Sequence, residues 1–595
     1  MKKVIFLLFL CLTSFAKAQN KQLAYDYFRK GEYQKSASIY EELYKKNSNN
    51  RSYFKQLTRC YQQLEEYSKA ETLILEQQKK FPKQSYLLVE LGYIYQLQNQ
   101  KEKATPLYKQ AIKAVENKPS SAYLTGKSFQ ENQLLDYALE VYKKATALKP
   151  KLNFNLYIAN IYGEKGEIDK MFDSYLDMIV QNPNYISTIQ RYVGKFITDD
   201  NQNENNILFK KTVLKRLQNN PDNSWNKLLS WLYMQQKDYD KALTQEKAIY
   251  KRNGSNLNTI FELANISFED RQYQTAKKTY IFIIESASNI IDVLEAENQL
   301  LLVNTFTAKN EEDYIEIEQK YKQLLTNFGT GSNTLTTQIN YAKFLVYTKN
   351  KPNEAITVLN QAEKVTTSKY IHGSIKIQKA DILVFTNKFN QALITYTQVQ
   401  SDLRGSEIAQ TARLKVAKTS YYKGDFDWAK TQLKVLKSAT SKLISNDALK
   451  LNLLIGDNIA EDTIRTALKK YAKADLLAFQ NKTQKAIDTL SVILKDFKGH
   501  AIEDEALYFQ AELFKKQGKF EFAENNYLKI IQLKKDGILT DDAYYELGEL
   551  YSNQLNDIEK AKEMYQKIIF NYANSIFLVD ARKKFRKLRG DLLDE

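Results

Sequence analysis

Proline and glycine are scarce in this chain of 595 residues. It contains 7 Pro and 18 Gly, well below ordinary usage, and these are the two residue types that most often interrupt helices. We find no alternation of apolar and polar residues long enough to indicate a sheet. With abundant Lys, Leu, Ala, Glu and Gln, this composition predicts an almost wholly helical protein of the all-α class.

The scarcity of histidine and cysteine excludes several kinds of chemistry. His372 and His500 are the only histidines, so a zinc site has nothing to build on. Neither a phosphate-binding glycine-rich loop nor a nucleophile elbow is present. Acid pairs such as Glu41-Glu42 are explained by helix surfaces and helix caps. The sequence therefore predicts a protein that is not an enzyme, with no catalytic residue, no metal ligand and no cofactor.

The first part of the chain, residues 1–18, has the form of a secretory signal peptide. Lys2 and Lys3 precede a short apolar run, and an A-x-A cleavage site ends at Ala18. The run is too short for a comfortable membrane span, and the bulky residues before Cys11 argue against a lipid anchor. We expect an exported protein in the periplasm, peripheral to the outer membrane at most, whose remaining Cys60 is a core thiol.

One regular spacing dominates the rest of the sequence. A small anchor residue recurs at equal intervals near the N-terminus, with an aromatic nine positions before it and a large side chain four positions after it. The anchors continue along the chain, at equal or slightly longer intervals within each run: Ser36, Ala70, Ala104, Ala138, Ala242, Ala276, Ala355, Ala392, Ala429, Ala486, Ala523 and Ala561. Met171, Phe209 and Ile317 fall where further anchors would stand, in weaker units or in irregular helical pairs.

This pattern resembles the tetratricopeptide repeat, a helix–turn–helix unit of about 34 residues. Small residues let the two helices of a unit approach, and the aromatic fills the space beside the contact. Gly31, Gly166, Gly424 and Gly518 fall at the predicted turn between the helices. Because one helical hairpin cannot bury its apolar face alone, the resemblance implies a right-handed superhelix, an α-solenoid, of roughly 12–15 units with a C-terminal capping helix.

We expect the chain after the signal peptide (1–18) to be organised in blocks of repeats. The predicted blocks are 19–183, an irregular middle block 184–330, 331–440, 441–576 and a capping helix 577–595. A polar run at 199–206 should lengthen one hairpin turn, and the stretch 327–333 reads as a loop between blocks. The interval from Ala429 to Ala486 is too long for one unit and too short for two, and we expect a short helix at 446–456 and a long one at 462–479.

The final helix has an apolar face and a basic remainder. Its apolar residues are Phe577, Ala581, Phe585 and Leu588, and its basic ones are Arg582, Lys583, Lys584, Arg586, Lys587 and Arg589. This arrangement fits a solvated cap, or a contact with an anionic envelope surface or an acidic protein. The formal net charge of +17 favours solubility, and the dispersed lysines predict no nucleic-acid partner.

The resemblance also implies where a partner would bind. In this family the first helix of each repeat lines the concave groove, which places there Lys21, Tyr25, Lys55, Arg59, Tyr93, Gln96, Tyr123 and Lys127. Rings flanked by cations suit an extended peptide or an acidic chain end. The other interpretation is that these residues face the groove without a specific ligand.

The C-terminal units are similar to a narrower group. The spacings Ala523-x-x-x-Tyr527 and Ala561-x-x-x-Tyr565 resemble the tetratricopeptide units of outer-membrane assembly lipoproteins and periplasmic coordinators. We therefore expect an exported scaffold that binds a protein or peptide in the bacterial cell envelope. The alternative is an adaptor subunit of an outer-membrane assembly or secretion machine.

Overall fold

The computed structural model describes residues 20–254, 256–439, 441–459, 465–533 and 537–590. These residues form helices, turns and loops, with no β-strand among them, so the prediction of an all-α fold is confirmed. The predicted signal peptide, residues 1–18, lies outside the described residues.

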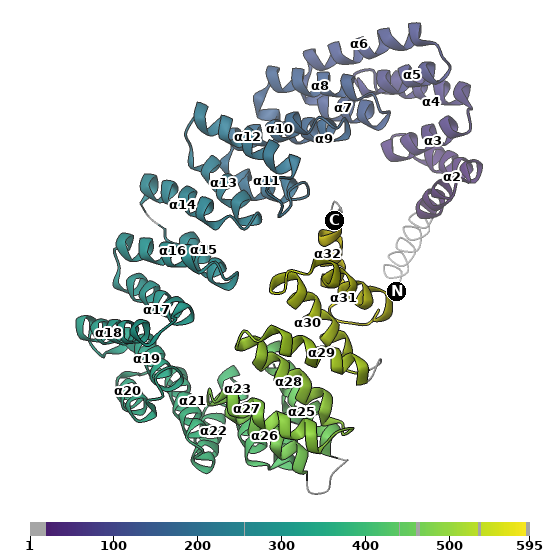
Figure 1. Ribbon diagram of the computed structural model, residues 1–595. Helices are drawn as coiled ribbons and strands as arrows, with labels where there is room; N and C mark the ends of the chain where they lie inside the picture. The colour runs from purple at the N-terminus through teal and green to yellow at the C-terminus, as the bar shows by residue number, and fades with distance from the viewer. Residues whose placement is uncertain (1–19, 255, 440, 460–464, 534–536, 591–595) are drawn as a thin grey trace, which may run out of the picture. The chain divides into compact units, whose positions relative to one another are not determined.

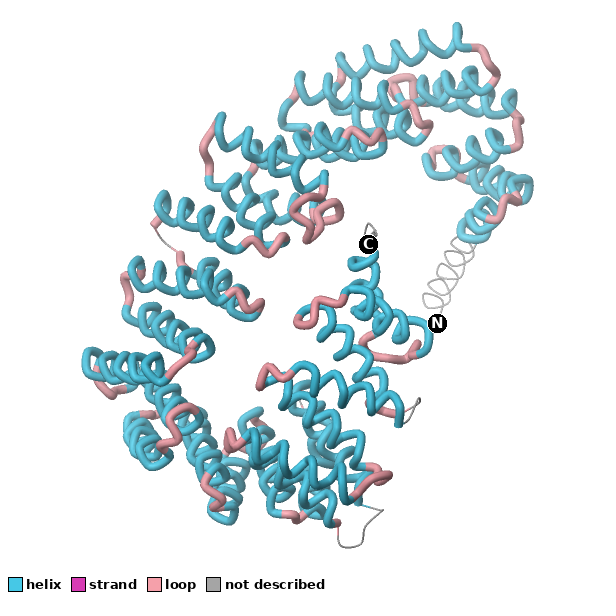
Figure 2. Tube along the Cα trace, in the orientation of Figure 1, coloured by secondary structure: helices cyan, strands magenta, loops and turns pink. Residues whose placement is uncertain are grey.

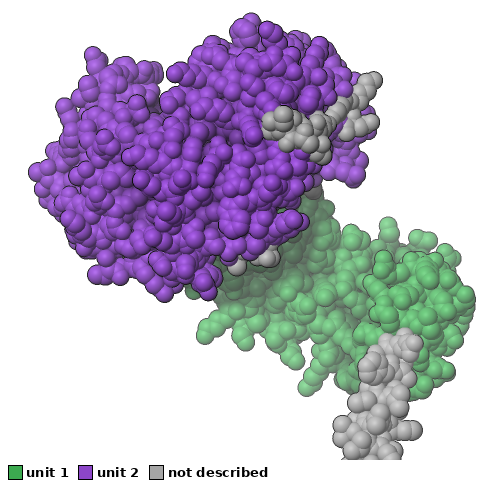
Figure 3. Space-filling model, turned by 90° about the horizontal axis from the view of Figure 1, so that it is seen from below, with its two compact units in different colours: residues 1–259 green, residues 260–595 purple. Residues whose placement is uncertain are grey.

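The chain divides into two compact units, residues 1–259 and 260–595 (Figure 3). In each of them successive helices follow one another as hairpins (Figures 1 and 2). In the first unit residues 20–29 are helical and are followed by α2 (Tyr33–Lys46), α3 (Arg51–Gln63), α4 (Tyr67–Lys80), α5 (Tyr86–Leu97), α6 (Lys101–Asn117), η1 (Pro119–Ser121), α7 (Ala122–Glu131), α8 (Leu135–Leu148), η2 (Pro150–Leu152), α9 (Asn155–Glu164), α10 (Ile168–Gln181), η3 (Pro183–Tyr185), α11 (Ile186–Val193), α12 (Glu204–Asn219), α13 (Asn223–Gln235) and α14 (Tyr239–Asn253).

Helix α15 (Asn258–Glu269) begins at the end of the first unit and continues into the second. The second unit then contains α16 (Tyr273–Ser286), α17 (Ile290–Thr307), α18 (Glu311–Phe328), η4 (Ser332–Thr334), α19 (Leu335–Tyr347), α20 (Pro352–Val365), α21 (Lys369–Phe385), α22 (Phe389–Asp402), α23 (Glu407–Lys423), α24 (Phe426–Val435), η5 (Leu436–Ser438), α25 (Lys442–Ile459), α26 (Thr466–Phe479), α27 (Thr483–Asp496), α28 (Ile502–Lys516), α29 (Phe520–Leu533), α30 (Thr540–Asn553), α31 (Ile558–Asn571) and α32 (Leu578–Arg589).

The anchor residues lie on the second helix of each pair, and all of them are buried. Ser36, Ala70, Ala104 and Ala138 lie on α2, α4, α6 and α8; Met171 and Phe209 on α10 and α12; Ala242, Ala276 and Ile317 on α14, α16 and α18; and Ala355, Ala392, Ala429, Ala486, Ala523 and Ala561 on α20, α22, α24, α27, α29 and α31. Burial of one small side chain per unit lets paired helices pack closely. The protein is thus an α-helical solenoid within each unit.

Several close helix contacts place a tyrosine ring against a glycine. A β-carbon added at Gly126 on α7 would lie 2.6 Å from Cε1 of Tyr142 on α8, and one added at Gly548 would lie equally close to Tyr565. Both rings are fully buried. At these positions the ring of the second helix takes the space that a side chain on the first helix would fill.

The turns between paired helices share one backbone conformation. Gly31, Gly166, Gly424 and Gly518 have φ between 72° and 86°, the left-handed conformation that commonly ends a helix. The equivalent position in other units has the same conformation without glycine: Glu65, Asn99, Gln133, Lys237, Arg271, Asn350, Asn387, Asn481 and Asn556. The turn therefore recurs with the repeat, whether or not glycine is present.

The segment between α24 and α27 departs from the expected pattern. The helix expected at 446–456 extends over the whole of α25, Lys442–Ile459, and the following helix begins at Thr466. The first helix is longer than predicted because Ile444, Ala448 and Ile455 recur at helical spacing and bury one face in the adjoining core. Part of the second expected helix, residues 462–464, lies outside the described residues.

The polar run at 199–206 includes the end of the connection between α11 and α12 and the first turn of α12. Asn206 is fully buried, donates to the carbonyls of Thr198 (2.8 Å) and Asp200 (2.6 Å), and accepts from the Thr198 amide (3.1 Å). Its side chain satisfies backbone groups that no helix pairs, which holds this long turn in one conformation.

Helix α32 packs its expected face against the last repeat. Ala581 is buried, Phe585 and Leu588 pack against the neighbouring core, and Phe577 stacks on Tyr545 with ring centroids 4.3 Å apart. The opposite face is more apolar than a solvated cap would need, because Val579 is 78% exposed. The end of the solenoid therefore presents both basic and apolar side chains.

Candidate functional site

In the first unit, side chains from three first helices meet on one surface. Lys55 and Arg59 on α3 both reach Glu131 on α7; Lys55 forms an ion pair with it, and the Arg59 guanidinium lies 3.8 Å from the same oxygen. Residues 55 and 131 belong to units that are not adjacent in sequence, so the contact spans the intervening repeat. Two cations that were expected to face a partner thus share a carboxylate of this chain.

The helix between them contributes a second carboxylate. Glu90 on α5 accepts a hydrogen bond from the Ser128 hydroxyl at 2.6 Å. Burial raises the pKa of Glu90, while the Ser128 hydrogen bond and the charge of Lys55 act in the opposite direction. Burial also lowers the pKa of Lys55, an effect that Glu131 opposes. Lys55, Arg59, Glu90 and Glu131 thus form a charge network whose members are partly buried and interact with one another.

An aromatic row continues beyond this network. Tyr123 on α7 and Tyr157 on α9 meet edge to face with centroids 5.5 Å apart, and the Lys127 ammonium lies 5.7 Å from the Tyr123 ring centre. Tyr123 is 38% exposed in spite of its size. A ring presented with a cation beside it can contact an extended segment by stacking and hydrogen bonding.

The remaining predicted residues are not part of one cluster. Lys21 and Tyr25 lie on the helical segment 20–29, and both are exposed. Tyr93 on α5 is half-buried. Gln96 accepts a hydrogen bond from the hydroxyl of Tyr108 at 3.0 Å, within its own repeat. The structure therefore brings together Lys55 and Arg59, and separately Tyr123 and Lys127, while Gln96 has a structural partner.

A second regular feature was not anticipated from the sequence. In the second unit a tyrosine four positions after an anchor donates its hydroxyl to an acid on the first helix of its own repeat: Tyr396 to Asp381, Tyr527 to Glu512 and Tyr565 to Glu549. A lysine from the next first helix or from the cap can join, as Lys415 does at 2.8 Å from Asp381 and Lys584 at 2.5 Å from Glu549. The acid precedes the repeated tyrosine at a nearly constant separation in sequence. This separation is the sequence signal from which the pairs could have been predicted.

An acid group of this kind links neighbouring repeats where a lysine of the next first helix joins it. Asp381 is buried, so its carboxylate needs the hydroxyl of Tyr396 and the ammonium of Lys415 as partners. The three side chains come from α21, α22 and α23, which span two consecutive units. We interpret the feature as structural reinforcement, because each oxygen is directed at a group of the chain itself.

Neither a metal-holding cluster nor a long apolar helix is found among the described residues. No group of three or more His, Cys, Asp or Glu side chains arranged to hold a metal ion is found among them. Nor does any helix in the described part of the chain combine the length and apolarity that a membrane span requires.

Two repeats match a family model by sequence. Residues 85–117, which contain α5 and α6, and residues 542–575, which contain most of α30 and all of α31, each match a tetratricopeptide repeat model. Each matched segment includes a close glycine–tyrosine contact, Gly92 with Tyr108 in the first and Gly548 with Tyr565 in the second. The chain therefore contains tetratricopeptide repeats, one matched segment in each of its two units. Repeats of this kind form surfaces on which other proteins bind.

The likeness to other whole proteins is weak. No curated protein matches the sequence. Among solved structures, a chain of the Naa15/Naa10 complex bound to HypK is 12% identical, with 97% of each chain covered and a TM-score of 0.27. A chain of the APC/C Cut9–Hcn1 hetero-tetramer is 13% identical, with 97% of this chain and 98% of that one covered and a TM-score of 0.23. The likeness to the tetratricopeptide family rests on the two matched repeats.

Proposed function

We propose that this protein is a non-enzymatic scaffold, exported to the bacterial cell envelope, that holds partner proteins against the first helices of its repeats. The observation that carries the proposal is the aromatic row on α7 and α9, in which the exposed ring of Tyr123 lies beside half-buried Tyr157 and Lys127. Large rings are costly to leave in water, and they dominate the energy of protein interfaces when they are covered.

The charge network next to this row affects what kind of partner fits. Lys55 and Arg59 already have Glu131 as a counter-charge, and separating them from it would cost energy before an acidic ligand could bind. A partner segment is therefore recognised chiefly by ring contacts and hydrogen bonds. An acidic chain end held by Lys55 and Arg59 is the less favourable mode.

Export is supported by the form of residues 1–18. Cleavage after Ala18 would leave Gln19 as the first residue of the mature protein. Sequencing the N-terminus of the protein purified from its source cells tests this directly. A protein that retains Met1 and stays in the cytoplasmic fraction would contradict the proposed export to the envelope, but not the proposed scaffold role.

The adaptor alternative is favoured by the end of the second unit. Phe570, Ile576 and Val579 are 72%, 86% and 78% exposed, and α32 adds basic side chains in its last turn. Apolar and basic groups together suit an acidic protein of an outer-membrane machine, or an anionic envelope surface. In this alternative the partner docks at the last repeats.

Affinity capture with matched variants separates the two modes. Tyr123→Ala combined with Lys127→Ala should abolish recovery of a partner that binds the first helices of the repeats. Lys113→Ala, on the exposed side of the second helix α6, is the control and should leave recovery unchanged. Loss of the partner through Ile576→Ser and Val579→Ser would favour the adaptor, and a partner that resists all of these changes would contradict both modes.

A further inference from the structure

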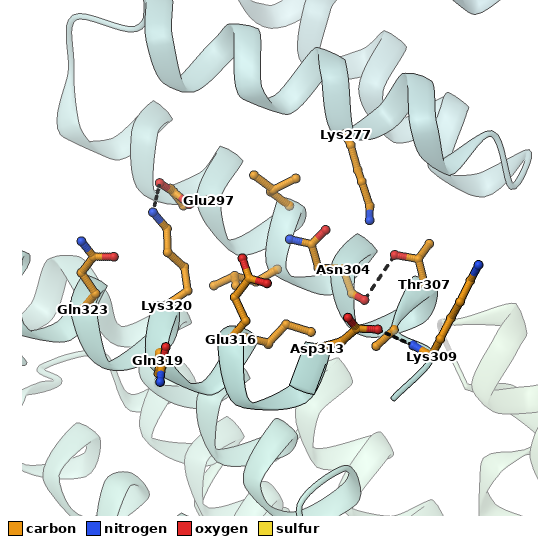
Figure 4. A pocket seen from close by; sticks show the side chains of 14 residues that line it. Lys277, Glu297, Asn304, Thr307, Lys309, Asp313, Glu316, Gln319, Lys320 and Gln323 are labelled. Atoms are coloured by element: carbon orange, nitrogen blue, oxygen red, sulfur yellow. Dashed lines mark hydrogen bonds and ion pairs between the residues drawn. The ribbon is translucent and has the colours of Figure 1, made fainter. Parts of the chain in front are cut away.

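The second unit contains a cleft of about 840 Å³ between α17 and α18, with one wall contributed by α16 (Figure 4). Its volume lies in the range of sites that bind small molecules or short peptides. It involves none of the charged or aromatic groups described above. Its lining includes both buried apolar and charged side chains, a combination that is typical of ligand-binding sites.

The cleft has a cause in the sequence. Helix α18 belongs to the unit whose anchor is Ile317 instead of alanine, and Ile317 is buried in the cleft floor beside Leu301. A larger anchor keeps the helices of the pair further apart than alanine would.

At one side of the cleft a buried carboxylate has one oxygen without a partner. Glu297 on α17 is only 7% exposed. Its Oε1 lies 3.4 Å from the Lys320 ammonium, whereas its Oε2 has no hydrogen-bond partner within the described part of the chain. Buried carboxylate oxygens are almost always hydrogen-bonded, so this atom is suited to receive a donor from a molecule in the cleft.

The other side of the cleft is cationic. Lys277 extends toward it from α16 (Figure 4), and Lys309, in the turn that follows α17, is among the residues that line it. The same two lysines also line an adjoining hollow of about 600 Å³. Its wall includes Tyr273 and the exposed ring of Phe306. Glu297 with Lys320 thus lies at one side of the cleft, and Lys277 and Lys309 lie at the other, with Asp313 next to Lys309 and apolar surface beside them.

We propose that the cleft binds a short zwitterionic peptide by its two free ends. The peptide ammonium would donate to Oε2 of Glu297, and its carboxylate would lie between Lys277 and Lys309. The other acids on the wall leave these roles open, because Asp313 accepts from the Lys309 backbone amide at 2.6 Å and Glu316 stands at the exposed rim. The ligand thus supplies the donor that Glu297 lacks and the anion that the lysines attract.

Titration calorimetry of the full-length protein tests the proposal, with tri-alanine as the probe. We expect tri-alanine to bind, and N-acetyl-tri-alanine and tri-alanine amide to bind at least about tenfold more weakly, since each lacks one charged end. Glu297→Gln should weaken tri-alanine about tenfold and leave the N-acetylated peptide unchanged. Lys277→Met should have the converse selectivity, weakening tri-alanine while leaving the amide unchanged.

Glu295→Gln is the matched control, because Glu295 is an exposed acid on the same helix and does not line the cleft. It should bind tri-alanine like the wild type. Unchanged circular dichroism would show that each variant is folded. Failure of tri-alanine to bind the wild type at millimolar concentration, or equal effects of Glu297→Gln and Glu295→Gln, would overturn the proposal. The scaffold function is tested at other residues, so either proposal can fail alone.

Discussion

The contact between Gly126 and Tyr142 gives a quantitative test of how the repeats pack. In Gly126→Ala, the new β-carbon would lie 2.6 Å from Cε1 of a fully buried ring, and overpacking of this kind costs about 1–3 kcal/mol. Alanine in place of glycine inside a helix gains about 1 kcal/mol. We therefore expect a net loss of local stability of about 0–2 kcal/mol.

Gly456→Ala provides the opposite case in the same protein. Gly456 lies within α25, where an added β-carbon would meet only the Lys430 ammonium at 3.8 Å. This variant should gain about 0.5–1 kcal/mol from helix propensity. The two substitutions are chemically identical, so a difference in sign between them isolates the packing contribution of the ring.

Hydrogen exchange read by mass spectrometry is the suitable assay, because a repeat array opens locally and a single unfolding free energy is not defined for it. Peptides from α7 and α8 should exchange faster in Gly126→Ala, while peptides from α25 should exchange more slowly in Gly456→Ala. A double variant, Gly126→Ala with Tyr142→Leu, should show a favourable coupling of about 1–3 kcal/mol. Equal stabilisation by both glycine substitutions would refute the packing argument.

Three further outcomes are expected. Lys415→Ala leaves buried Asp381 without its ammonium partner and should lower local stability by about 3 kcal/mol. Lys170→Ala, which removes an exposed ion pair, should have almost no effect on stability. Hydrogen exchange in α21–α23 and in α10 checks the two variants. Burial and a neighbouring carboxylate raise the pKa of Asp542 from 3.8 to about 6, so the folded state binds more protons than the unfolded state. The stability of α30 should therefore fall by about 1 kcal/mol, a value discounted for partial exposure, as pH rises from about 4 to 6. Asp542→Asn should remove this pH dependence. Burial raises the pKa of the Cys60 thiol, so a water-soluble maleimide should label it only when the first repeats open; rapid labelling of the native protein would contradict its buried position.

The spacing of the small and aromatic residues was sufficient to predict the helical hairpins. In the turns between the helices, the residue type alone does not always indicate the backbone conformation. Gly31 could be assigned to a turn because glycine favours positive φ. Lys237 and Arg271 adopt the same conformation, with φ of 56° and 60°, although neither residue type indicates it. Their conformation is imposed by the packing of the helices on either side. A repeat position can therefore be inferred from the period even where the residue itself gives no signal.

The contacts between repeats could not be predicted from the same spacing. The pairing of Lys55 with Glu131 depends on how far successive first helices converge, and the period alone does not fix this geometry. The cleft beside Ile317 has a similar origin, because the sequence marked that unit as irregular without showing how the helices separate. Side-chain contacts across non-adjacent units need three-dimensional geometry, whereas contacts within one unit repeat with the sequence.

The central functional claim is that partners bind the first helices of the repeats, and site-specific photo-crosslinking tests it most directly. A photoreactive phenylalanine would replace Tyr123 on α7 or, as a control, Lys113 on α6, in cells of the source organism. The account predicts that position 123 crosslinks to an envelope protein and that position 113 does not. Crosslinks that are equal at both positions, or absent at position 123, would contradict the account.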